Sequence, residues 1–82
     1  MTTARPAYFE IIDFIASGTT PESVISFHPS RDVEERVSEL IEREKDGTIS
    51  PDEKDELDQV MELEHIIRMA KIRAREILSS GH

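Results

Sequence analysis

Oxygen-bearing side chains recur between residues 42 and 53 at the spacing of a twelve-residue calcium-binding loop. Calcium takes roughly six to eight oxygen ligands, and such a loop supplies them from alternate positions around a glycine at its sixth place. With Gly47 at the sixth place, the ligand positions fall on Glu42, Glu44, Asp46, the carbonyl of Thr48, Ser50 and Glu53. The spacing therefore offers a calcium-responsive turn as one interpretation of the sequence.

Two features of this segment argue against a calcium site. The first and third positions carry Glu42 and Glu44, whose side chains are longer than the Asp or Asn that suits these positions, so their oxygen atoms are misplaced for the ion. Gly47 also explains the end of one helix, and the residues from Ser50 to Glu53 form a capping box that starts the next helix. We therefore expect no specific calcium site. A small calcium-responsive protein with an EF-hand-like turn is the alternative interpretation.

The remaining residues with chemical potential form no complete catalytic arrangement. Glu62 and His65 have the Glu-x-x-His spacing of ferritin-like di-iron helices, but that chemistry needs two such motifs and two further inward glutamates. His28 precedes Pro29 and suits a loop better than a catalytic base. No serine lies in a nucleophile elbow, and no glycine-rich loop is present to hold phosphate. The sequence predicts no catalytic residue, no cofactor and no enzymatic activity.

The charge distribution limits the kind of partner. The 82 residues carry a net charge of −8, and residues 30–59 contribute five basic and twelve acidic groups. Because phosphate contacts dominate affinity for nucleic acids, this acidic middle argues against nucleic acid as a partner. No apolar run reaches the length of a membrane span, and there are no cysteines. We therefore expect a cytoplasmic protein that does not enter the membrane.

Helix start and stop signals divide the chain into four expected helices within a single domain. Prolines and Ser or Thr caps precede the helices, and glycines follow two of them. The expected helices are 6–17, 20–28, 30–46 and 50–78. The last two form an antiparallel hairpin. The sequence thus predicts an all-α fold, a small helical bundle built on this hairpin, with a long C-terminal helix and a short apolar N-terminal helix.

The long C-terminal helix carries two apolar stripes on roughly opposite sides. The main stripe contains Val60, Leu63, Ile67, Ala70, Ala74 and Ile77, and is widened by Ile66 and Leu78. The second stripe contains Met61, Met69 and Ile72, with His65 among them. A helix that is apolar on two sides is normally sandwiched between neighbours. We therefore expect the residues of the second stripe to bind a partner.

The helix lengths limit what one chain can cover. At 1.5 Å per residue the long helix spans about 40 Å and the helix before it about 22 Å, so roughly the last dozen residues of the long helix extend past the hairpin. The first helix, about 16 Å long, has the size to cover them. A core of this size is marginal without a disulfide or a metal. We therefore expect a homo-oligomer or a hetero-complex rather than an isolated monomer.

Several short segments carry a resemblance to a known group of proteins. They are Phe14–Glu22, Phe27–Ser30, Leu40–Glu44, Thr48–Lys54 and Leu63–His65. Together they resemble small acidic helical proteins that are common in cyanobacteria and have no assigned activity. Some of that group resemble the antitoxin half of gene pairs with a nuclease-like companion. The resemblance implies a non-enzymatic protein–protein interaction module, an antitoxin-like or accessory subunit, with a protein such as a toxin-like nuclease as its partner.

Overall fold

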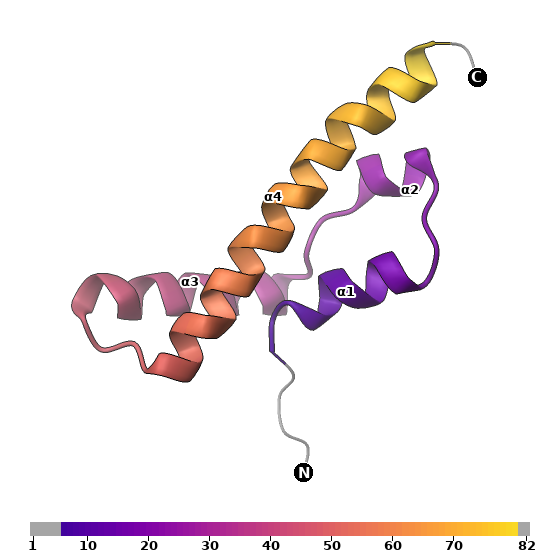
Figure 1. Cartoon of the computed structure of the whole chain (residues 1–82). Coiled ribbons are helices and arrows are strands. Elements are labelled where there is room, and N and C mark those ends of the chain that lie inside the picture. Colours follow the sequence, from indigo (N-terminus) through magenta and orange to yellow (C-terminus); the bar gives the residue numbers. More distant parts are fainter. Residues whose placement is uncertain (1–5, 81–82) are drawn as a thin grey trace.

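The computed structural model describes residues 6–80, and these residues form four helices (Figure 1). Helix α1 spans Phe9–Ala16, α2 Pro21–Ser26, α3 Arg31–Asp46 and α4 Pro51–Ser79. No strand occurs within the described range. The prediction of an all-α fold with a long C-terminal helix is confirmed.

Side-chain caps set the starts of three helices. Thr20 and Ser23 cap α2 reciprocally, with the Ser23 amide donating to Thr20 Oγ1 at 3.1 Å and the Thr20 amide donating to Ser23 Oγ at 2.9 Å. Ser30 Oγ accepts from the Val33 amide at 3.3 Å at the start of α3. Each bond satisfies an amide that has no partner inside its own helix.

The first two helices are shorter than expected. Helix α1 begins at Phe9 rather than at residue 6, because the Phe9 amide first closes a turn on the carbonyl of Pro6 at 3.0 Å. Helix α2 ends at Ser26 rather than at residue 28, because Phe27 already has an extended backbone with ψ of 135°. The expected boundaries of α3 and α4 differ from the observed ones by at most one residue.

The hairpin between α3 and α4 turns where the sequence predicts it. Gly47 has a φ of 76°, a left-handed conformation that glycine adopts without steric cost, and the Thr48 amide donates to the carbonyl of Arg43 at 2.9 Å. Ser50 then caps α4, accepting from the Glu53 amide at 3.1 Å, while Glu53 Oε1 accepts from the Ser50 amide at 2.9 Å. Beyond the turn the two helices diverge, so that α4 crosses α3 obliquely (Figure 1).

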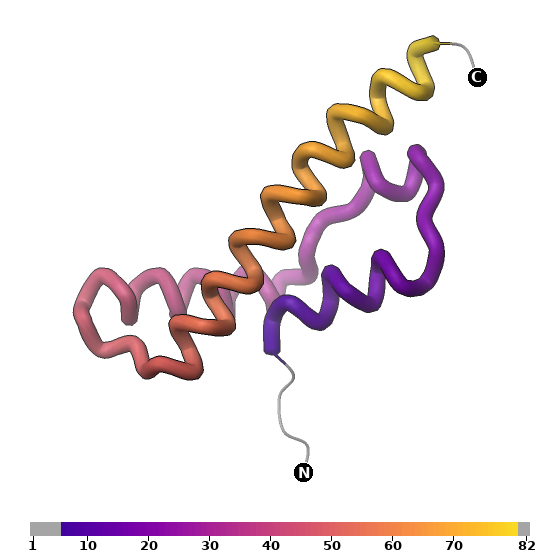
Figure 2. The backbone as a smooth tube through the Cα atoms, in the orientation of Figure 1, coloured from indigo at the N-terminus to yellow at the C-terminus, as the bar shows by residue number. Residues whose placement is uncertain are grey.

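Helix α2, rather than α1, packs against the C-terminal half of α4 (Figure 2). Lys71 on α4 donates to the carbonyl oxygens of Ile25, at 3.2 Å, and of Phe27, and these carbonyls lie at the end of α2. The expectation that the first helix covers this part of α4 is therefore wrong. Helix α1 lies beside the start of α3 instead, because Glu10 accepts a hydrogen bond from the Ser30 amide at 2.7 Å.

The hydrophobic core is small and runs along the side of α4 that packs against α2 and α3. Within residues 6–80, its buried members are Ala7, Ile11, Leu40, Leu57, Val60, Ile67 and Ala74. The main stripe of α4 thus points inward as predicted, with the exception of Ile66 and Leu78, which are exposed. The radius of gyration is 14.9 Å, whereas a compact domain of this length has about 12 Å. The fold is therefore open for its size.

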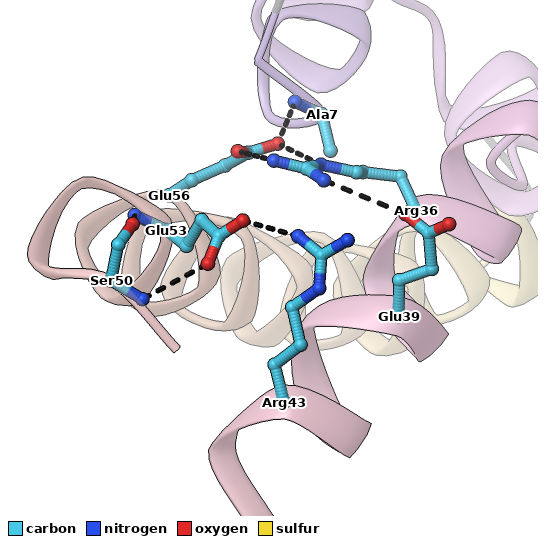
Figure 3. Close-up of polar contacts among 7 residues, drawn as sticks. All are labelled: Ala7, Arg36, Glu39, Arg43, Ser50, Glu53 and Glu56. Carbon is cyan, nitrogen blue, oxygen red and sulfur yellow. Dashed lines mark hydrogen bonds and ion pairs between the residues drawn. The ribbon is translucent and has the colours of Figure 1, made fainter. Parts of the chain in front are cut away.

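The carboxylate of Glu56 joins three parts of the fold (Figure 3). It accepts from Arg36 on α3 at 2.9 and 3.2 Å, and from the Ala7 amide just before α1 at 2.9 Å. Burial raises the pKa of Glu56, but the hydrogen bonds from Arg36 and Ala7 outweigh burial, so the pKa lies below its ordinary value. The same pair raises the pKa of Arg36. The charged form of Glu56 therefore stabilises the junction.

We expect Ser50→Ala to lower the free energy of unfolding by about 0.5–2 kcal/mol, because the Glu53 amide loses its cap. Ser38→Ala, at an exposed position within α3, is the control and should leave stability nearly unchanged. Urea denaturation followed by circular dichroism measures both. Equal stability of the two variants would contradict the capping interpretation.

We expect the free energy of unfolding to fall as the pH drops from about 5 to about 3, because Glu56 has a lowered pKa and loses its stabilising charge in that window. Glu56→Gln should cost about 1–2 kcal/mol at neutral pH and should flatten this dependence. Glu39→Gln is the matched control, since Glu39 contacts the same arginine at 3.5 Å from an exposed position. Thermal melts across the pH range test this. An unchanged pH profile in Glu56→Gln would contradict the assignment.

Candidate functional site

The side of α4 opposite the core carries large apolar side chains in contact with solvent. Met61 is 49% exposed, Met69 57% and Ile72 54%, and His65 lies exposed among them. These four residues are the second stripe expected from the sequence, and we call them the outer face of α4. Neither α2 nor α3 covers the outer face, because both pack on the side of α4 that carries Val60 and Ala74.

Ile66 extends the apolar surface beside the outer face. It is 49% exposed, although the sequence pattern assigns it to the main stripe. A step of one residue turns a helix by about 100°, which places Ile66 on the flank between the two stripes. A flanking residue of this kind is buried only when the core is wide enough to reach it. Here the core is too narrow, and Ile66 joins the exposed surface.

The charges of α4 are segregated along its length. Residues 51–65 contain seven acidic and one basic side chain, whereas residues 66–79 contain four basic and one acidic side chain. Glu62 lies exposed beside the apolar residues of the outer face near its start, and Arg73 lies exposed near its end. The outer face is thus an apolar strip with a negative and a positive end.

A second exposed apolar area lies on α1. Ile12 is 39% exposed and Ile15 is 46% exposed, whereas Ile11 on the same helix is fully buried. The sequence predicts a short apolar helix here, and the structure leaves these two isoleucines in solvent. They provide a chemically matched comparison for the residues of α4.

The turn at residues 42–53 is held together by its own ion pairs. Glu42, Glu44 and Asp46 all lie within α3, so their backbone is helical rather than wrapped around an ion. Glu44 pairs with Lys54 at 2.7 Å. Glu53 pairs with Arg43 (Figure 3). Between residues 6 and 80 no group of three or more His, Cys, Asp or Glu side chains has a geometry that could hold a metal ion. The structure does not bring together the six ligand positions of the alternative, calcium-binding interpretation.

The pKa shifts at this turn follow from the same pairs. The hydrogen bond from the Ser50 backbone, followed by the charge of Arg43, lowers the pKa of Glu53. Asp58, at 2.8 Å, and Glu44 raise the pKa of Lys54. Both groups therefore stay charged, and each charge has a partner of opposite sign within the protein.

The other residues considered for chemistry do not assemble into one reactive cluster. Glu62 and His65 are exposed on α4, and His28 is exposed in the connection between α2 and α3, where its ring lies 3.3 Å from the carbonyl of Pro29. Lys71, a basic residue that could have contacted phosphate, is occupied by the end of α2. These positions do not combine into a catalytic arrangement.

An open groove of about 780 Å³ lies between α1 and α3. Its lining includes Phe9, Val33, Arg36, Glu10 and Glu56. Two of the carboxylates that line the groove are engaged, Glu56 by Arg36 and Glu10 by the Ser30 amide. These two side chains therefore serve the helix junction.

Comparison of the chain with protein-family models, with curated proteins and with solved structures gave no match. Within the described residues, no helix combines the length and the apolar character that crossing a membrane requires.

We expect no saturable binding of calcium at micromolar concentration in physiological salt, because Lys54 and Arg43 already neutralise Glu44 and Glu53. Isothermal titration calorimetry of the whole chain is the measurement. A saturable one-site isotherm that disappears in Glu53→Gln would contradict this expectation and favour the calcium-responsive interpretation.

Proposed function

We propose that this protein is a non-enzymatic protein–protein interaction module, an accessory or antitoxin-like subunit, and that the outer face of α4 is its binding surface. The observation that carries the proposal is the exposure of Met61, Met69 and Ile72 along one side of a helix whose other side is packed. Exposed apolar residues that scatter singly need no explanation, but residues aligned along one helix face are typical of helix-in-groove recognition.

The size of the core supports the proposal. Among residues 6–80, seven residues are buried, two of them alanines, and seven large apolar side chains are exposed. Over this range, large apolar side chains are therefore exposed as often as residues are buried. A protein with so small a core gains stability when a partner covers its exposed apolar surface, because binding to the folded state alone raises the free energy of unfolding.

The residue types of the outer face also suit a binding surface. Methionine side chains are flexible and polarisable, so they adapt to partners of different shape. His65 adds a polar group that can donate and accept hydrogen bonds beside them. The acidic and basic ends of the face provide orientation, since complementary charges fix the register of a complex more than they raise its affinity.

We expect a photo-crosslinking amino acid at Met69 to form covalent adducts when the protein is made in cells of its own host. The same probe at Ser38, exposed on the polar side of α3, should form few adducts. A probe at Ile15 tests whether any exposed apolar position gives the same result. Denaturing gel electrophoresis followed by mass spectrometry identifies the adducts, whether they contain another protein or a second copy of this chain.

Two outcomes would contradict the proposal. One is the absence of adducts from Met69 at normal expression levels. The other is an equal yield from Met69 and Ser38, because random collisions do not favour one face. Adducts at Ile15 but not at Met69 would indicate that the binding surface lies on α1, and would contradict its assignment to α4.

A further inference from the structure

We propose that the outer face of α4 is covered by the same face of a second copy of this chain. The two α4 helices lie antiparallel around a twofold axis near the middle of residues 61–73. This inference rests on the function proposed above and names the partner for the same face. It follows from the spacing of the exposed residues, from the order of the charges along α4 and from the open shape of the fold.

The spacing of the exposed residues matches a twofold axis. Met61 and Ile72 are eleven residues apart, and so are Glu62 and Arg73. Eleven residues make about three helical turns, so the members of each pair lie on one line along the helix. An antiparallel arrangement therefore sets Met61 against the partner's Ile72 and Glu62 against the partner's Arg73, and symmetry repeats both contacts.

The acidic first half and the basic second half of α4 complement each other when two α4 helices lie antiparallel. An antiparallel copy brings the acidic half of one helix beside the basic half of the other, whereas a parallel copy brings like charges together. The helix dipole does not account for Glu62 and Arg73, because its effect fades within the first and last turns. Glu62 lies eleven residues after the start of α4, and Arg73 lies six residues before its end.

The shape of the fold leaves room for this contact. Helix α4 extends along the molecule, whose longest dimension is 49 Å, with α3 crossing its N-terminal part and α2 beside its C-terminal half (Figure 2). From Met61 to Ile72 the outer face spans about 17 Å. An interface of this length belongs to the small end of stable protein interfaces. The dimer is accordingly expected to dissociate in the micromolar range.

The test uses sedimentation equilibrium of the purified whole chain from about one to several hundred micromolar. The wild type should show a monomer–dimer equilibrium. Glu62→Arg and Arg73→Glu should each weaken the dimer by about tenfold, because each creates two pairs of like charges. The double variant should return to within about threefold of the wild type. Glu35→Arg, a charge reversal on the exposed side of α3, is the control and should change nothing.

Circular dichroism establishes that each variant keeps its helical content, so that a loss of dimer is not a loss of fold. A third change, Met69→Glu, should abolish the dimer at all concentrations. A wild type that stays monomeric throughout the range overturns the inference. Single reversals that weaken the dimer without rescue by the double variant overturn the pairing of Glu62 with Arg73. Single reversals without effect, in a dimer that Met69→Glu disrupts, overturn the antiparallel arrangement.

The experiments distinguish an error in the proposed dimer from an error in the proposed interaction function. If the chain is monomeric in solution but crosslinks from Met69 to a different protein in cells, the proposed interaction function holds and the second copy is not the partner. If the chain is monomeric and forms no adducts, both the interaction function and the dimer are wrong.

Discussion

The carboxylate of Glu56 is the point at which three parts of the structure meet. It receives two hydrogen bonds from Arg36 on α3 and one from the amide that precedes α1, so a single side chain of α4 orients two other helices. Hydrogen bonds to a charged group that is mostly shielded from water are among the stronger polar contacts in proteins. Because so few apolar residues are buried, this junction has a larger share in the stability than a similar ion pair has in a protein with a wide core.

The position of this junction decides which face of α4 stays in solvent. Glu56 lies one turn before Val60, and Arg36 lies one turn before Leu40, and both of these apolar residues are fully buried. The ion pair therefore continues the line of the core and holds α3 on the inner side of α4. Lys71 does the same for α2 by binding its terminal carbonyls. Once both neighbours are held on one side, no helix among the described residues is left for the outer face of α4, since α1 is tied to the start of α3.

Much of the fold follows from local signals. The Gly47 stop and the Ser50 cap define the hairpin, and the three-and-four spacing of Val60, Ile67 and Ala74 identifies the buried side of α4.

The packing of α2 instead of α1 on α4 was not predictable in this way, because it depends on Lys71 reaching carbonyls that lie more than forty residues away. One feature of the sequence does indicate the role of Glu56, because this glutamate lies in line with the main apolar stripe of α4. The i,i+4 spacing within α3 would pair Arg36 with Asp32 and Arg43 with Glu39. In the structure, the two arginines instead bond to Glu56 and Glu53 of α4, whose carboxylates are better shielded from solvent than that of Glu39.

The two sides of α4 differ in how their polar groups are paired, and this difference parallels the difference in apolar burial. On the inner side, Glu53, Glu56 and Lys71 all bond to groups of other elements, namely Arg43, Arg36 and the end of α2. On the outer side, Arg73 bonds to Glu76 one turn away on the same helix. Such exposed pairs within one helix contribute little to stability, so they leave the side chain free to exchange partners. Both sides of α4 therefore have an apolar centre with charged residues beside it. The inner side packs against α2 and α3, whereas no described helix packs on the outer side. A helix that approaches from outside can satisfy both kinds of group at once.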